Sequence, residues 1–367
     1  MELLVLDSHT IAIERPSLET SFPDPLQDAD RPAPAQPPAR AATAPHTPAP
    51  SPIRGTVVRL ARKLAHVLVV RLPWGLQDRI YFLATFRRWP NLHQPRTFNE
   101  KVLYRKRVYG DHPTYRRLAD KFAVRAHVAA RVGRQYLIPL LHDTTDPASL
   151  LERTQWQRTV IKSSHGSGMV ALMLDEPDQT RRQALMADCQ RWLRTDFSKA
   201  VREIHYRGIP PRLLVEQYIG DGAQPPVDYK FHMFRQRDGR FQYVLQVIYR
   251  SSGAPLSMTF FVNSLSVPFH GIRDAGLSPP CTGAQLQHAL ELSKALAAEF
   301  DYVRVDWYIQ AGRIYFGELT FTPGAGLVTG LDKGLDALMG QMWVQRVRPA
   351  LAVPRRPAPA LQARPLA

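Results

Sequence analysis

Two carboxylates and an arginine near the end of the chain have the types and spacing that metal and phosphate chemistry needs. Arg304 and Asp306 alternate with apolar residues in YVRVDWYI (302–309), and Glu318 follows in IYFGELT (314–320). Side chains two positions apart on a strand share one face. Mg²⁺ takes one or two protein carboxylates and completes its shell with water and phosphate oxygens. The pattern indicates a divalent cation that neutralises phosphate, and the alternative is a solvated hairpin with a cross-strand ion pair.

The register of this hairpin decides whether the three side chains meet. We expect a three-residue loop at 310–312 with its glycine in the left-handed conformation, which pairs Arg304 with Glu318 and Asp306 with Phe316. Glu318 and Phe316 then share one face. A two-residue loop would shift the register by one and send Glu318 to the opposite face.

A lysine and a glycine-containing loop form a second candidate phosphate site. The predicted strand TVIK (159–162) ends at Lys162 and runs into SSHGSG (163–168). Glycines let backbone N–H groups approach phosphate oxygens, and the lysine adds positive charge. The GxxxxGK[ST] pattern is missing from the sequence, so this is not a P-loop, and an ordinary turn is the alternative.

Helical and strand patterns of a mixed α+β domain position these residues. In the strand at 227–234, Asp228, Lys230 and His232 share one face, and the turn at 237–240 makes it a hairpin with 241–250. Apolar periodicity predicts the other elements: helices at 98–104, 114–125 (with Asp120, Lys121 and Arg125), 179–194 and 284–300, and strands at 136–141 and 212–219.

The chain is strongly basic. Its formal net charge is +16, and residues 54–134 hold 19 Lys and Arg against four Asp and Glu. Such a segment favours an anionic partner: nucleic acid, an acidic membrane surface or an anionic substrate, unless it is only a solvated surface. Aromatic residues occur at core spacing in the strands without a stacking platform, which argues against nucleic acid.

Composition also divides the chain. We expect a disordered Pro/Ala-rich arm at 1–52, a basic helical segment at 53–95, a main domain at 96–345 with a lid at about 150–222, and a Pro/Arg-rich tail at 346–367. The basic amphipathic helix at 54–72 either lies on an anionic membrane surface or packs on the main domain.

The two cysteines imply no disulfide framework, and we find neither a secretory signal nor an apolar run of about 20 residues that could span a membrane. We therefore expect a cytoplasmic protein, at the inner face of the membrane if the helix binds there.

Three blocks of the chain resemble the TupA-like ATP-grasp family, which is associated with bacterial cell-surface polymers. They are TFNEKVLYRKRVYGDHPTYRRLADKFAVR (97–125), IKSSHGSG (161–168) and VRVDWYIQAGRIYFGELTFTPGAG (303–326). The resemblance spans roughly 95–345. It implies an ATP-grasp fold, in which two α/β lobes clasp ATP, and the cofactors ATP and Mg²⁺.

The resemblance also implies roles for single residues. Nucleotide contacts would come from Lys121, Lys162, His165, Gly166, Ser167, Gly168, Glu216, Gln217, Ile219, Asp228 and Lys230. The metal ligands would be Asp306, Glu318 and Thr320, where Thr320 stands in place of the asparagine of the broader ATP-grasp pattern. Arg304 and Lys230 would be catalytic, and Arg125 and Arg250 are candidates to hold the substrate.

The activity that the resemblance implies is ATP-dependent joining of a carboxylate to an amine through an acyl-phosphate. The substrate would be an anionic glycan, its precursor or an amino acid, which places the reaction in cell-surface polysaccharide synthesis. Two alternatives stay open at this point: a kinase acting on a sugar or lipid hydroxyl, and a non-catalytic basic adaptor for membrane or nucleic acid. The pairing of Asp306 with Glu318 and the two lysines argue against the adaptor.

Overall fold

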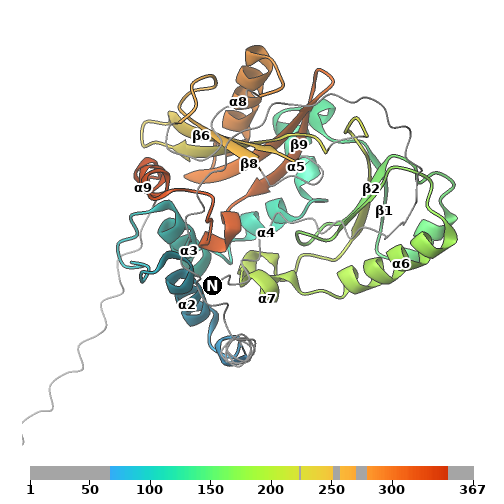
Figure 1. The fold of residues 1–367 in the computed structure, drawn as a ribbon, viewed down its shortest axis with the longest axis horizontal. Helices are drawn as coiled ribbons and strands as arrows, with labels where there is room; N and C mark the ends of the chain where they lie inside the picture. Colours follow the sequence, from blue (N-terminus) through green and yellow to red (C-terminus); the bar gives the residue numbers. More distant parts are fainter. Residues whose placement is uncertain (1–66, 223–224, 251–256, 270–278, 346–367) are drawn as a thin grey trace, which may run out of the picture. The chain divides into compact units, whose positions relative to one another are not determined.

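The computed structural model describes four stretches of the chain (Figure 1): residues 67–222, 225–250, 257–269 and 279–345. The chain divides into two compact units, and 67–77 is the described part of the smaller one. The larger unit, from Asp78 onward, contains both sheets. The predicted arm (1–52) and tail (346–367), and residues 54–66 of the predicted basic helix, lie outside the described stretches.

The described stretches contain both helices and strands. The α-helices are α2 (Trp74–Phe86), α3 (Phe98–Val108), α4 (Pro113–Ala119), α5 (Val124–Arg131), α6 (Gln179–Leu193), α7 (Phe197–Val201), α8 (Gly283–Ala297) and α9 (Lys333–Met342), with 3₁₀ turns η1 (Arg134–Tyr136), η2 (Pro147–Glu152), η3 (Ile204–Tyr206) and η4 (Pro323–Gly326). The strands are β1 (Leu140–Thr144), β2 (Thr159–Ser163), β3 (Val170–Met173), β4 (Leu213–Gln217), β5 (Asp228–Arg235), β6 (Phe241–Tyr249), β7 (Ser257–Val262), β8 (Tyr302–Gln310) and β9 (Arg313–Thr320).

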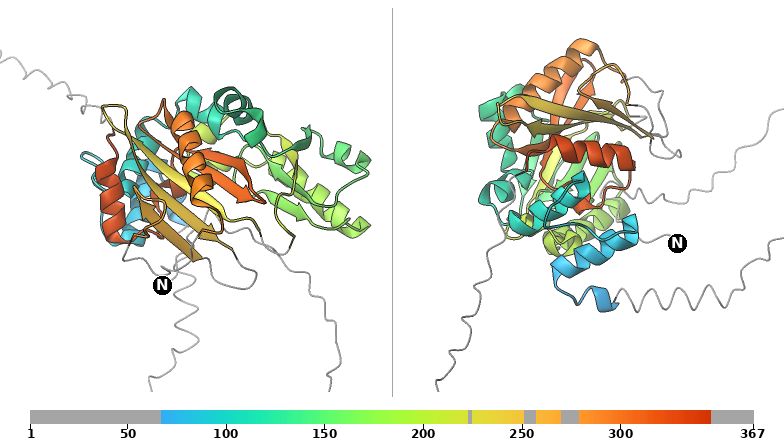
Figure 2. Two further views of the ribbon diagram at one scale, coloured as in Figure 1. Left: turned by 90° about the horizontal axis from the view of Figure 1, so that it is seen from above. Right: turned by 90° about the vertical axis from the view of Figure 1, so that its left-hand side faces the viewer.

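The small lobe is a four-stranded antiparallel sheet in the order β1-β4-β2-β3, with α6 beside it (Figures 1 and 2). Trp156, Ile161, Leu185 and Trp192 meet in its core. The prediction of a strand at 136–141 was wrong, because residues 134–136 form the η1 turn and the strand β1 begins only at Leu140. The sheet thus includes β1, which precedes the expected lid boundary at 150, and β3, which the sequence analysis did not predict.

The large lobe is a five-stranded antiparallel sheet in the order β7-β6-β5-β8-β9. Tyr229, Phe231, Val305 and Trp307 project from one face and pack with residues of α8. The opposite face is covered in part by apolar residues of α3 and α9. The same face also carries the polar residues that alternate with the core residues: Asp228 and Lys230 on β5, and Arg304 and Asp306 on β8. β7 and α9 were not predicted from the sequence.

The β8–β9 hairpin differs from the expected geometry at its turn. Residues 310 and 313 are paired, which leaves a two-residue turn instead of the predicted three-residue loop. Both turn residues have positive φ, 49° for Ala311 and 80° for Gly312. This is the type I′ geometry that matches the twist of the strands.

A β-bulge at Gly317 restores the polar face. Asp306 pairs with Glu318 and Trp307 with Phe316, so Gly317 is the extra residue, and Arg304 pairs with Thr320. The predicted pairs were therefore wrong, as was the prediction that Phe316 shares a face with Glu318, because Phe316 packs in the core. The conclusion that Glu318 and Asp306 share a face is confirmed.

The single helix expected at 114–125 is split into α4 and α5. Asp120 caps the end of α4 with an extended backbone (ψ 114°), and its side chain accepts a hydrogen bond from the Phe122 N–H at 2.9 Å. A short aspartate side chain competes in this way with the helical hydrogen bond. Lys121 therefore lies in a turn between two helices.

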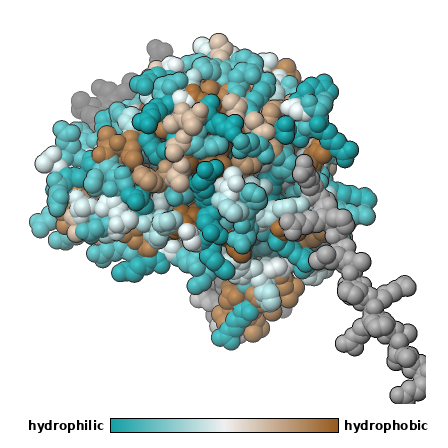
Figure 3. Space-filling model, turned by 180° about the vertical axis from the view of Figure 1, so that it is seen from behind, coloured by the Kyte–Doolittle hydropathy of each residue, from teal (hydrophilic) through white to brown (hydrophobic). Residues whose placement is uncertain are grey.

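The described surface carries few large exposed apolar side chains. Hydrophilic residues predominate on the face shown in Figure 3, and hydrophobic ones form small groups. None of the helices in the described stretches is long and apolar enough to cross a membrane.

Candidate active site

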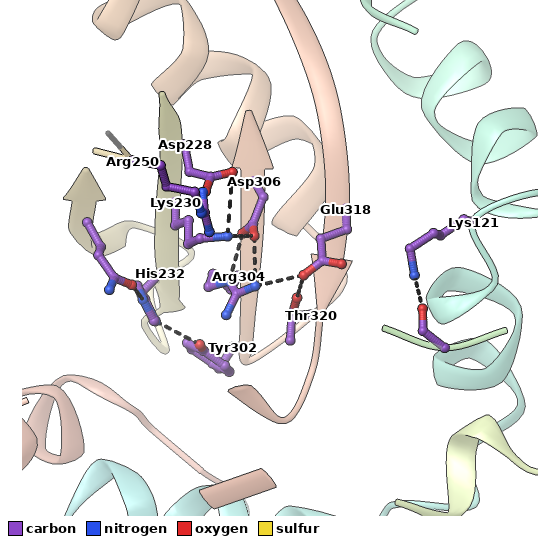
Figure 4. Close-up of polar contacts among 12 residues, drawn as sticks. Lys121, Asp228, Lys230, His232, Arg250, Tyr302, Arg304, Asp306, Glu318 and Thr320 are labelled. Atoms are coloured by element: carbon purple, nitrogen blue, oxygen red, sulfur yellow. Dashed lines mark hydrogen bonds and ion pairs between the residues drawn. The ribbon is translucent and has the colours of Figure 1, made fainter. Parts of the chain in front are cut away.

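Arg304 joins the two carboxylates across β8 and β9 of the large sheet (Figure 4). Its Nε donates to Asp306 Oδ1 and its Nη2 to Asp306 Oδ2, both at 2.7 Å, and Nη2 also lies 2.7 Å from Glu318 Oε1. The Arg304 and Asp306 side chains are almost fully buried, whereas 35% of the Glu318 side chain is exposed. The exposed carboxylate marks the side from which a ligand can approach.

Charge compensation keeps this buried cluster ionised. Burial alone would lower the pKa of Arg304, but the Asp306 and Glu318 carboxylates outweigh it and raise that pKa above its ordinary value. Burial would likewise raise the pKa of Glu318, but the charges of Arg304, Lys121 and Lys230 hold it well below the ordinary value. Glu318 is therefore a carboxylate at neutral pH, as a cation ligand must be.

The neighbouring strand β5 contributes further charges. Lys230 Nζ lies 2.5 Å from Asp306 Oδ2 and 4.0 Å from Asp228 Oδ1. Arg250, at the end of β6, forms an ion pair with the other oxygen of Asp228. Asp228 and Arg250, predicted to bind ribose and substrate, are thus brought together and hold each other. The shared face of Asp228, Lys230 and His232 is as predicted, since the intervening Tyr229 and Phe231 lie in the core.

Thr320 supports Glu318 from the same strand. Its hydroxyl donates a hydrogen bond of 2.8 Å to Glu318 Oε1. The predicted role of Thr320 was that of a metal ligand. In this arrangement the hydroxyl donates to the carboxylate and orients it, and the role of Thr320 as a metal ligand stays a prediction.

Lys121 reaches the small lobe from the turn between α4 and α5. Its backbone N–H donates to the Ser164 carbonyl at 3.0 Å, and its ammonium group contacts the Gly166 carbonyl. Burial lowers the pKa of Lys121, and the nearby Glu318 charge opposes that shift. Lys121 is thus bonded to the loop after β2, and its charge also acts on Glu318 of the large lobe.

Lys162 and Arg125 meet at Glu216. Lys162 Nζ lies 2.5 Å from Glu216 Oε2, and Arg125 Nη1 lies 3.1 Å from Glu216 Oε1. Arg125 also donates to the Ile138 carbonyl at 2.9 Å. Two cations therefore share one buried carboxylate, which leaves excess positive charge beside the loop. Arg125, predicted to hold the substrate, lies beside the predicted nucleotide contacts instead of beside Arg250.

The loop at 163–168 is built tightly against the small lobe. The ring of His165 is buried, and its Nε2 lies 3.1 Å from the Trp192 carbonyl, so this side chain does not face the carboxylates. Burial lowers its pKa and keeps the ring neutral. A Cβ on Gly166 would lie 2.3 Å from Met169 Cε. Ser167 and Gly168 complete the loop, and Gly168 has a φ of 75°.

The predicted adenine-contacting strand is β4 with the residues after it. Gln217 N–H donates to the Pro139 carbonyl at 3.0 Å, and Tyr218 N–H donates to the Arg158 carbonyl at 2.8 Å. These two amides are therefore already paired within the protein. Glu216 uses its side chain for Lys162, and half-buried Ile219 follows the end of the strand.

One buried contact beside this site was not predicted from the sequence. The Thr322 hydroxyl, two residues beyond Thr320, contacts the carboxyl of Glu203 after α7. Burial raises the pKa of Glu203 to about 7, although the Lys106 charge opposes the shift. The two residues are 119 positions apart, and no sequence pattern connects them.

The donor set of Asp306 and Glu318 fits a Mg²⁺ ion that is shared with phosphate. Both carboxylates converge on one nitrogen, Arg304 Nη2, at 2.7 Å each. The described stretches contain no group of three or more His, Cys, Asp or Glu side chains that could enclose a metal. Two carboxylates suffice for Mg²⁺ when waters and phosphate oxygens complete its shell.

Two solved structures to which the chain is similar are ligases by title. D-Alanine-D-Alanine Ligase from Helicobacter pylori matches at 12% identity with a TM-score of 0.41, over 61% of either chain. VanG D-Ala:D-Ser Ligase from Enterococcus faecalis matches at 12% identity with a TM-score of 0.37, over 62% of this chain and 60% of that one. The chain thus spans less than two thirds of these proteins. A search of curated protein sequences gave no match.

The family model described as TupA-like ATPgrasp matches residues 100–344. This range contains both sheets and every predicted site residue, and it covers most of the chain. It confirms the resemblance noted in the sequence, and with it the α+β ATP-grasp fold. The chain belongs to the TupA-like ATP-grasp family.

Proposed function

We propose that the protein is an ATP-dependent ligase that joins a carboxylate to an amine. The observation that supports this most is the bridging of Asp306 and Glu318 by Arg304, with Lys230 on the same sheet face. Family membership adds the ATP-grasp fold, and the resemblance implies that its two lobes clasp ATP. Lys121 and Lys162 from the small-lobe side supply the remaining positive charge.

The reaction would proceed in two steps. A substrate carboxylate oxygen attacks the γ-phosphorus of ATP, the bond to the β-phosphate oxygen breaks, and ADP leaves. An amine then attacks the acyl-phosphate carbon, phosphate leaves with the bonding electron pair, and the amine loses a proton to give the amide. Positioning and charge neutralisation dominate such phosphoryl transfer.

Each residue of the site has a role in these steps. Mg²⁺ bound to Asp306 and Glu318 would supply neutralising charge to the phosphates. Arg304 and Lys230 lie beside the carboxylates and would stabilise negative charge on the transferring group. Lys121 holds the loop at 163–168 through the Gly166 carbonyl, which suits a lid that keeps water from the acyl-phosphate.

The substrates are proposed from the charge of the chain and the family. An acidic cell-surface polysaccharide or its precursor, or an amino acid, would meet the basic segment at 54–134. Peripheral membrane association of the basic helix at 54–72 remains part of this proposal, as does a cytoplasmic location at the inner membrane face.

Measurement of ADP release by the purified protein tests the ligase proposal. We expect release only when ATP, Mg²⁺, a carboxylate and an amine are all present. If ADP is released at the same rate with and without the amine, and the phosphate stays on the acceptor, the protein is a kinase instead. Failure of Mg²⁺-ATP to raise the melting temperature would contradict nucleotide binding itself.

A further inference from the structure

A concave cavity lies outside the candidate active site, between α5, the η1 turn and the tip of the β8–β9 hairpin. Its volume is about 480 Å³. Arg125, Arg134 and Arg313 line it, together with an aliphatic wall formed by residues 137–139. None of the described residues that line it is acidic. We call it the arginine pocket.

Two of the three arginines carry uncompensated charge. Arg134 and Arg313 are exposed, and within the described stretches neither forms an ion pair. The Arg313 guanidinium lies over the Tyr315 ring, 5.4 Å from its centre, in a cation–π contact. Arg125 is fixed by Glu216 and by the Ile138 carbonyl. A planar guanidinium pairs with both oxygens of a carboxylate or phosphate, so the pocket matches such an anion.

The wall of the pocket limits the kind of anion. Leu137, Ile138 and Pro139 line the same cavity as the arginines and offer aliphatic surface, and Ala126 and Ala129 add to it. The cavity volume falls in the range of small-molecule sites. An organic molecule with a carbon skeleton and one anionic group can satisfy both surfaces, whereas a merely solvated basic patch needs no concave apolar wall.

The pocket wall is bonded to both parts of the candidate active site. The Pro139 carbonyl accepts a hydrogen bond from Gln217 N–H at 3.0 Å, next to Glu216. On the other side, Leu137 forms a β-bridge with Phe316, the residue before the bulge that positions Glu318. A ligand that moves this wall or Arg125 therefore acts on residues of the nucleotide site.

We propose that the arginine pocket binds a small organic anion, a carboxylate or a phosphate ester, at a site distinct from that of ATP. Its occupancy changes nucleotide affinity through Arg125 and Glu216. Anion binding itself is independent of the proposed ligase function, whereas the coupling to nucleotide rests on it. The two parts can therefore fail separately.

Calorimetric titration of the full-length protein tests the binding site. The probes are D-galacturonate for a carboxylate, glucose 6-phosphate for a phosphate ester and D-galactose as the neutral control. We expect one of the anionic probes to bind and galactose not to bind. Loss of two charge-assisted contacts in R134A/R313A should weaken that binding by at least about tenfold. The variant R237A/R240A removes two exposed arginines from the β5–β6 turn and should bind the probe as the wild type does.

The outcomes separate the explanations. The proposal is overturned if neither anion binds, if R237A/R240A loses as much affinity as R134A/R313A, or if excess ATP displaces the probe competitively. If the protein binds no ATP but still binds the probe in an Arg134- and Arg313-dependent manner, the pocket stands and the ligase proposal fails. The coupling is tested by the ATP affinity of the wild type with and without the probe, which should differ in the wild type and not in R134A/R313A.

Discussion

Glu318 lies directly opposite Asp306 across β8 and β9, although the hairpin turn has only two residues. Continued as a regular ladder from this turn, β9 would place Glu318 opposite Val305, on the core face. The bulge adds Gly317 as one extra residue and shifts the register, so both carboxylates reach Arg304 Nη2 at 2.7 Å. The β-bulge next to the candidate active site thus directs the Glu318 side chain to the polar face.

A side chain at position 317 should disturb this bulge. A Cβ there would lie 3.1 Å from the Asp306 carbonyl oxygen and 3.3 Å from Tyr308 Cε2. We expect G317A to lower the free energy of unfolding by about 1–3 kcal/mol and to reduce ADP release. Urea unfolding and the ADP assay measure the two effects. The control G283A adds a methyl group at the start of α8, where a Cβ meets nothing within 4 Å; equal losses in both variants would contradict the role of the bulge.

Loss of the Asp306 charge should abolish activity. D306N keeps the side-chain shape but removes the carboxylate that pairs with Arg304 and Lys230. We expect ADP release to fall at least about a hundredfold while circular dichroism stays unchanged. T320V removes only the hydroxyl that donates to Glu318 and should cost about tenfold. A T320V variant as inactive as D306N would instead make Thr320 a direct ligand.

Lys121 and Lys101 offer a matched pair of half-buried lysines. Lys101 Nζ bonds to the carbonyls of Gly340 (2.7 Å) and Trp343 (2.6 Å), whereas Lys121 Nζ bonds to the Gly166 carbonyl and its charge interacts with that of Glu318. We expect K121M to weaken ATP binding by about tenfold to a hundredfold, because a charge on phosphate is lost. K101M should lower the melting temperature and leave ATP affinity unchanged. Calorimetric titration with Mg²⁺-ATP distinguishes the two.

Glu203 should make stability depend on pH. Because burial raises its pKa to about 7 from 4.5, the native protein holds a proton between these pH values that the unfolded chain releases. Its contribution to stability is therefore complete below pH 4.5 and is lost as pH rises through 7. E203Q keeps the side-chain size without the charge, so its stability relative to the wild type should rise by about 2–3 kcal/mol between pH 5 and pH 8.

Chemical unfolding at the two pH values checks this dependence. E299Q is the control, since Glu299 is an exposed partner of Arg131. A difference between E203Q and the wild type that is the same at pH 5 and pH 8 would show that Glu203 is already ionised in the native protein.

The elements with strong period-two or helical patterns were predictable from the sequence. β2, β5, β6, α6 and α8 lie within two or three residues of the expected bounds. Prediction failed where side chains or distant strands decide the backbone. Asp120 ends α4 because its side chain accepts a hydrogen bond from the nearby Phe122 N–H. The position of β1 is set by its pairing with β4, more than 60 residues later in the chain. Neither effect leaves a local apolar period to recognise.

The sequence by itself determined which chemistry is available. The alternation around Arg304 and Asp306 required one polar strand face, and the lysine before SSHGSG predicted a phosphate-binding loop. The ordered motifs indicated the family. Only the tertiary structure decided the register through the bulge at Gly317 and the contact of Glu203 with Thr322. It also decided the pairing of Arg125 with Glu216. Local patterns fix which face a side chain takes, whereas the partner across that face depends on chain segments brought together only by folding.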